Sequence, residues 1–122
     1  MATKSERLQS ILAQLRQDTG DVEASAVVSV EGLMIASDMP RDINKDTVAA
    51  MSAALLSLGK RAAQEQARGK FNQVFISGED GSSIVSVAGE KALLSVLVRS
   101  DANLGLVFLE MKRAANEIQD IV

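Results

Sequence analysis

The 122-residue sequence contains no cysteine, histidine, tyrosine or tryptophan, and only three phenylalanines and one proline. Without cysteine there are no disulfides, thiolate nucleophiles or cysteine-based metal sites. Without histidine the chain lacks the most common general base and the most common zinc ligand. The shortage of aromatic side chains also removes stacking platforms for nucleic-acid bases. We therefore expect no catalytic residues, no metal ion and no cofactor.

Charge and hydropathy narrow the class of protein further. The net charge of -3 argues against a dedicated nucleic-acid binder, which would carry a basic face. No run approaches the roughly 20 apolar residues that span a bilayer. The N-terminal MATKSERLQS lacks the apolar region of a signal peptide. We expect one globular domain over residues 1–122 that works in the cytosol.

Hydrophobic periodicity predicts three helices and five strands. The helices are expected over residues 5–18, from Asn44 or Asp46 to Arg68, and from Asn103 onward. Thr3 and Glu6 match a capping box for the first helix, and Gly20 is expected to end it in the left-handed conformation. Runs of β-branched and apolar residues predict the strands, at 24–30, 33–37, 71–77, 83–89 and 92–98.

The predicted strands are joined within each group by short turns, which require antiparallel neighbours. Several strands, such as 92–98, carry apolar residues on both faces, so both faces of the sheet should be covered. The element order αββαβββα therefore predicts an α+β fold, a five-stranded antiparallel sheet with helices on both faces.

The middle helix contains a stretch without charge, TVAAMSAALLSLG, between Thr47 and Gly59. A helix that is apolar all round is usually buried all round, and a chain this short has little material to cover two faces. We expect the bulkier stripe to lie on the protein's own core, and that stripe consists of Val48, Met51, Leu55, Leu58 and Ala62. We expect a second subunit to cover the other side, which consists of Ala49, Ala50, Ser52, Ala53, Ala54, Leu56 and Ser57.

Other patterns in the chain have ordinary explanations. Ser57 and Lys60 match the S-x-x-K pattern of serine acyl-enzymes, but the companion motifs of that chemistry are missing. The neighbouring carboxylates Asp18 and Asp21 are interpreted as solvated loop charges. A further group consists of generic surface arginines, any of which has the chemistry of an arginine finger: Arg41, Arg61, Arg68 and Arg99.

Three segments of the sequence resemble the Roadblock family of dynein light chains and bacterial GTPase-regulator domains. The first is the helix ending at Gly20 together with AVVSVEGLMIAS, residues 26–37, which is similar to the family's strand, acidic-glycine turn and Leu-x-Ile-Ala strand. The second is the alanine-rich helix, and the third is NLGL at residues 103–106. The last helix resembles the bacterial and archaeal branch, because eukaryotic members tend to be shorter there.

The resemblance implies a Roadblock/profilin-like fold and a homodimer. In that dimer the alanine-rich helix packs on its counterpart, and the third strand, with Phe71, Gln73 and Phe75, pairs edge to edge into a ten-stranded sheet. It also implies a non-enzymatic regulatory or scaffold protein that binds a small Ras-like GTPase and modulates its nucleotide cycle or localisation. The family has no fixed catalytic signature, so no residue inherits one.

Two other functions stay open at this point. The chain is also consistent with a structural adaptor subunit of a motor or membrane-associated complex, without effect on GTP hydrolysis. It is also consistent with a sensory module that encloses a small ligand. A heterodimer with a paralogue is a further possibility, because seams of small residues specify their partners weakly.

Overall fold

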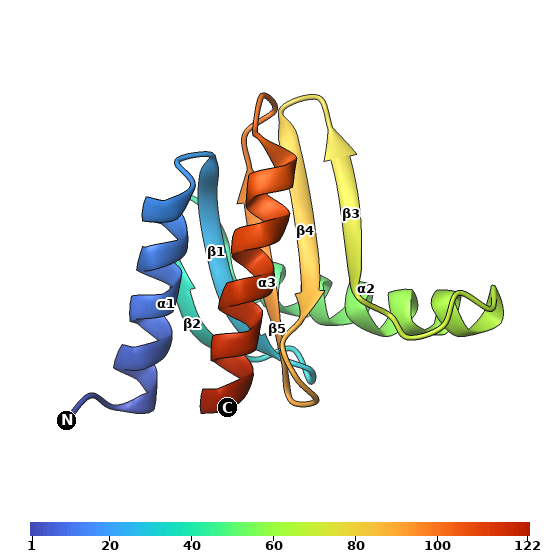
Figure 1. Cartoon of the computed structure of the whole chain (residues 1–122), viewed down its shortest axis with the longest axis horizontal. Coiled ribbons are helices and arrows are strands. Elements are labelled where there is room, and N and C mark those ends of the chain that lie inside the picture. Colours follow the sequence, from blue (N-terminus) through green and yellow to red (C-terminus); the bar gives the residue numbers. More distant parts are fainter.

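The computed structural model describes residues 1–122, and its helices and strands follow the expected order (Figure 1). The elements are α1 (Lys4–Asp18), β1 (Val22–Ser29), β2 (Met34–Asp38), α2 (Lys45–Glu65), β3 (Gln73–Gly78), β4 (Gly81–Val87), β5 (Ala92–Val98) and α3 (Leu104–Ile121).

All neighbouring strands in the sheet are antiparallel, and their spatial order is β2-β1-β5-β4-β3. Helices α1 and α3 lie next to each other on one face of the sheet, and α2 crosses the other face (Figure 1). The α+β prediction with helices on both faces is therefore confirmed. Strands β2 and β3 form the two edges, so each has one side without a strand neighbour.

The core consists of two layers that contain different numbers of buried residues. The layer between the sheet and the α1/α3 pair contains 19 buried residues, among them Leu12, Leu94 and Ile118 with no exposed surface. The layer under α2 contains six, which are Ala26, Val28, Ala49, Leu56, Val85 and Leu93. The α2 layer is therefore the smaller one, and alanines make up part of it.

The expected helix starts are confirmed. Thr3 and Glu6 form the capping box of α1. Asn44 caps α2 by accepting a bond from the Thr47 amide at 3.0 Å, and Asn103 caps α3. These side-chain oxygens satisfy amides that have no partner in the first turn.

Two helix ends differ from expectation. Helix α1 ends with Thr19 as its cap, and Gly20 is not in the left-handed region. Helix α2 ends at Glu65, three residues before Arg68, because Ala67 adopts a φ of 55°. The amide of Arg68 then donates to the carbonyl of Ala63, which closes the helix. The left-handed position is thus occupied by alanine, a residue type that rarely adopts this conformation, so the sequence does not predict the helix end at this point.

A buried hydroxyl pair ties α2 to the middle of the sheet. The Ser52 hydroxyl donates to the Ser95 hydroxyl at 3.1 Å, and both residues are buried. We expect Ser95→Ala to lower the free energy of unfolding by about 1–3 kcal/mol, because it leaves the Ser52 hydroxyl without a partner. The double variant Ser52→Ala/Ser95→Ala should be close to wild type. Urea unfolding of Ser95→Ala, Ser52→Ala and the double variant measures this, and additive losses would contradict it.

Candidate protein-interaction surface

Helix α2 buries a stripe of two small residues and one leucine against the sheet, and two of its large apolar residues face the outside. Ala49, Ser52 and Leu56 are the buried residues of the helix. Met51 and Leu58 are 61% and 65% exposed. The prediction that the bulkier stripe lies on the protein's own core is therefore wrong for Met51 and Leu58, whereas Leu55 of the same stripe packs partly buried against the core. The helix is rotated from the expected orientation, so that Ala49, Ser52 and Leu56 face inward.

The reason is that other parts of the chain come close to α2 at two places. At Gly32, in the β1–β2 turn, an added Cβ would lie 3.7 Å from the Ala53 Cβ and 3.8 Å from the Ala50 Cα. At Gly59 an added Cβ would strike the ring of Phe71 and lie 2.9 Å from the Val74 side chain. Only small side chains leave room for these contacts, so α2 turns Ala53 toward Gly32 and Gly59 toward Phe71.

The exposed face of α2 carries a regular stripe, which we call the α2 stripe. Its members are Thr47, Met51, Ala54, Leu58 and Arg61, all exposed. They recur at intervals of four and three residues, the spacing with which one helix packs against another in a coiled coil. With Ala54 between them, Met51 and Leu58 form an exposed apolar stripe, and such contiguous apolar surface is a candidate interaction site.

The second component of the surface is the free edge of β3. This strand pairs only with β4, so the backbone groups along its other side have no strand partner. Ile76 lies on the α2 face of the strand, because its neighbour in register is Ser83 and alternate residues face alternate sides. Ile76 is 42% exposed. An uncovered edge strand with an exposed apolar side chain invites pairing with another chain.

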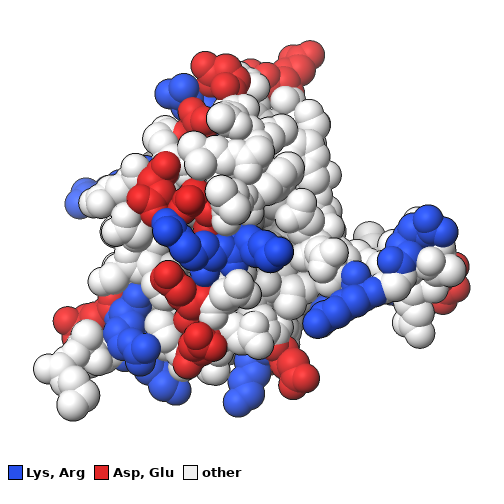
Figure 2. Space-filling model, viewed as in Figure 1, with Lys and Arg blue, Asp and Glu red and all other residues white.

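These two components lie next to each other in the fold. Helix α2 crosses beneath the sheet, and its C-terminal end projects beyond β3 (Figure 1). The projecting end and the loop after it carry the basic residues Lys60, Arg61, Arg68 and Lys70, and the tip that extends past the sheet in Figure 2 carries blue side chains. A second chain that pairs with the β3 edge would therefore also meet the projecting part of α2.

The structure places the ten predicted interface residues in different environments. Ala49, Ser52 and Leu56 are buried inside the protomer and are corrected to core residues, while Ala53 is partly buried beside Gly32. Phe71 precedes β3, and its ring packs against Gly59. The remaining five are exposed: Ala50, Ala54, Ser57, Gln73 and Phe75.

Phe75 does not point toward α2. Its ring meets that of Phe108 on α3 edge-on, with 6.0 Å between the centroids. Sequence reasoning also missed Met51, Leu58 and Ile76 as surface residues. The intervals of four and three residues along the exposed stripe are the signal that identifies the first two.

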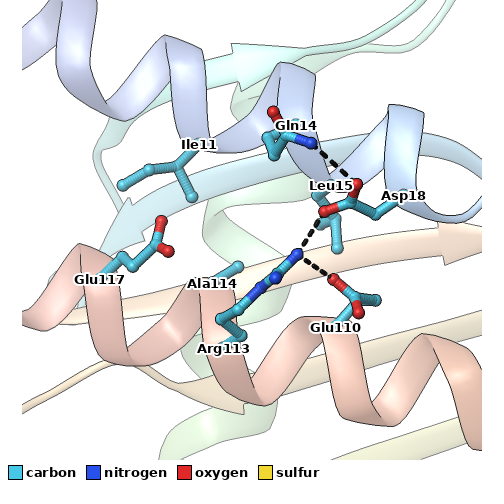
Figure 3. Close-up of a pocket in the computed structure, with 8 residues that line it drawn as sticks. All are labelled: Ile11, Gln14, Leu15, Asp18, Glu110, Arg113, Ala114 and Glu117. Carbon is cyan, nitrogen blue, oxygen red and sulfur yellow. Dashed lines mark hydrogen bonds and ion pairs between the residues drawn. The ribbon is translucent and has the colours of Figure 1, made fainter.

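The carboxylates that stood out in the sequence take part in ion pairs. Asp18, at the end of α1, binds Arg113 of α3 and accepts a bond from Gln14, while Arg113 also binds Glu110 (Figure 3). These side chains line a small hollow between the two helices, and the guanidinium lies across it (Figure 3). Asp21 binds Arg99 and the amide of Asn103. Both carboxylates join elements of the fold, which is a structural role.

A family profile and a curated relative decide the family. The profile of the Roadblock/LC7 domain matches residues 8–98. The uncharacterized protein MJ0310 of Methanocaldococcus jannaschii is 38% identical over 109 residues, which cover 89% of this chain and 94% of that protein. The chain belongs to the Roadblock/LC7 family. The expected resemblance is thus confirmed, and this relative comes from an archaeon.

Solved structures of other proteins share the fold of this chain. The structure titled "MglB with tetrameric arrangement" superimposes with a TM-score of 0.90 at 26% identity and covers 99% of this chain and 91% of that chain. Profilin II of Acanthamoeba castellanii superimposes with a TM-score of 0.67 at 14% identity, covering 93% and 97% of the two chains, and so shares the fold. No helix of this Roadblock chain is long and apolar enough to pass through a bilayer.

Proposed function

We propose that this Roadblock chain forms a homodimer through the β3 edge and the α2 stripe. A two-fold axis beside β3 would pair the two edge strands antiparallel into a ten-stranded sheet. The same axis would bring the projecting end of each α2 beneath the other protomer, so that Met51 and Leu58 of the two copies face each other. A single two-fold rotation would then cover both the free β3 edge and the exposed α2 stripe.

The single observation that carries the dimer is the exposure of Met51 and Leu58 on the same sheet face as Ile76. Burying a fully exposed side chain of this size contributes about 1.5–3 kcal/mol, so covering the 42–65% that is still exposed contributes roughly half of that for each residue, and the two-fold axis doubles each contribution. The buried residues Ala49, Ser52 and Leu56 would stay in the core of each protomer.

The dimer is proposed to act as a non-enzymatic regulator or scaffold of a small Ras-like GTPase. Family membership and the similarity to MglB support this role. The mechanism would be positional, because a rigid ten-stranded sheet with paired helices can hold the switch loops of a GTPase in one conformation. The unpaired arginines on the exposed side of α2 and in the loop after it, such as Arg61 and Arg68, are groups that such a dimer could present in trans.

The test uses the small Ras-like GTPases encoded in the same genome. Each is loaded with GTP and followed for hydrolysis and for nucleotide release, with and without the dimer. We expect one GTPase to bind and one of its two rates to change about fivefold or more, the scale of a typical coupling free energy. Binding without a change in either rate would favour the structural adaptor, and the absence of binding to every GTPase tested would contradict the proposal.

A further inference from the structure

On the opposite face of the sheet, no helix covers β3 either. Helix α3 packs over β5 and β4, and α1 lies on its far side, next to β2 and β1 (Figure 1). Phe75 therefore emerges beside α3 with 40% of its surface exposed. Its ring leans on Phe108, and Leu109 next to it on the helix is 63% exposed. Phe75 and Phe108 make an apolar shelf beside the helix, and Leu109 lies at its rim, because consecutive residues of a helix point in different directions.

The shelf is free of charge. The residues of β3 and β4 on this face are Gln73, Phe75, Ser77, Ser82, Ile84 and Ser86, as the register of the two strands requires. Figure 2, which views this face, shows uncharged surface over β4 and β3 beside α3. On the wall, Lys112 is exposed and stands one helical turn beyond Phe108 on the same side of α3. The shelf is thus an apolar and hydroxyl-lined floor beside a wall that carries Lys112.

In the proposed dimer the two shelves join into one groove across the two-fold axis. Its floor is β3 with its copy, and its walls are α3 with its copy, so Lys112 stands on both sides. Because α3 lies over β4 and β5, about four strand spacings of 4.7–4.9 Å separate the two α3 axes, or about 19 Å. Two packed helices have axes 8–10 Å apart, so this gap equals two helix-to-helix spacings. It has room for one further helix.

We propose that this α3–β3 groove binds a single amphipathic α-helix of a partner protein, one helix per dimer. The inference rests on the proposed dimer and names a surface on the sheet face opposite to the α2 stripe. The apolar side of the helix would lie on Phe75 of both protomers and against Leu109. Acidic residues along both flanks of that stripe would meet the two Lys112 side chains. The groove follows the strands, so α3, with 18 residues, sets the length of helix that it accommodates.

The test uses a display library of 18-residue helices. Each member has an apolar stripe at positions i, i+3, i+4 and i+7, and Glu or Lys is varied on its flanks. The library is selected against protein shown by light scattering to be dimeric. We expect enriched members to carry Glu on both flanks and to bind at one helix per two chains in calorimetry. Leu109→Glu should weaken their binding at least tenfold, and Lys112→Glu should change the selected flanks from Glu to Lys.

Leu106→Glu is the matched control. Leu106 is 37% exposed on the same helix but stands one turn before Glu110, on the flank that faces α1. Binding by this variant should equal that of the unmodified protein. Failure to enrich any helix, two helices per dimer, or equal losses in the two leucine variants would overturn the proposal.

Three further outcomes distinguish a failure of the groove from a failure of the proposed function. A tetramer that Leu109→Glu converts to a dimer would mean that a second dimer occupies the groove, and a monomer would overturn the groove and the dimer together. A dimer that binds the selected helix but no GTPase supports the groove and counts only against the GTPase role.

Discussion

Leu58→Glu is expected to convert the protein from a dimer to a monomer. In the proposed dimer Leu58 lies in the α2 stripe close to its counterpart, so the substitution would place two carboxylates in a seam without water. We expect dimer affinity to fall at least about a hundredfold, or about 2.8 kcal/mol. Light scattering at micromolar concentration should give twice the chain mass of 12.9 kDa for the unmodified protein and the chain mass for the variant.

The fold itself should survive this change, because the Leu58 side chain is 65% exposed in the protomer. Leu109→Glu is the matched control, since Leu109 is 63% exposed on the opposite face of the sheet. It introduces the same charge at a similarly exposed site and should leave the dimer intact. A dimeric Leu58→Glu protein would place the interface elsewhere. Ala53→Glu is unsuitable for this test, because Ala53 packs beside Gly32 and its replacement would disturb the fold.

The elements of this fold are readable from the sequence because each carries a local signal. The capping oxygens of Thr3, Asn44 and Asn103 satisfy amides a few residues away, and the alternation of apolar residues depends only on the strand period. The end of α2 was misjudged because Ala67 adopts a left-handed conformation that favours glycine or asparagine.

The faces of α2 were not readable in the same way. A helix that is apolar on all sides has no polar face to show which way it turns. The choice depends on Gly32 and Phe71, which approach α2 from other parts of the chain, and on the bond between Ser52 and Ser95 across 43 positions. Side-chain size alone suggested the opposite orientation. Contacts between segments far apart in the chain therefore determine which residues of α2 are exposed. The sequence predicts that the helix has more apolar surface than its own core can cover, but not which side remains exposed.

Gly59 is the residue at which this orientation can be tested most directly. Glycine within a helix costs about 1 kcal/mol relative to alanine, so replacing it with a good helix former would normally stabilise the protein. Here the new side chain would collide with Phe71, which precedes β3, and with Val74, which lies in β3. We expect Gly59→Leu to lower the free energy of unfolding by about 1–3 kcal/mol, as overpacking does. Thermal and urea unfolding measure the change.

Gly20→Leu is the control for the glycine substitution, because no atom lies within 4 Å of an added Cβ at Gly20 and its φ is not positive. Its stability should be close to that of the unmodified protein. The decisive comparison is Gly59→Leu in a Phe71→Ala background, where removal of the ring makes room for the leucine. The loss there should be at least about 1 kcal/mol smaller than in the presence of Phe71. Equal losses in both backgrounds would mean that Gly59 does not set the distance between α2 and β3. If the losses differ as expected, the inward face of α2 is the one with Gly59, and Met51 and Leu58 are left for a partner.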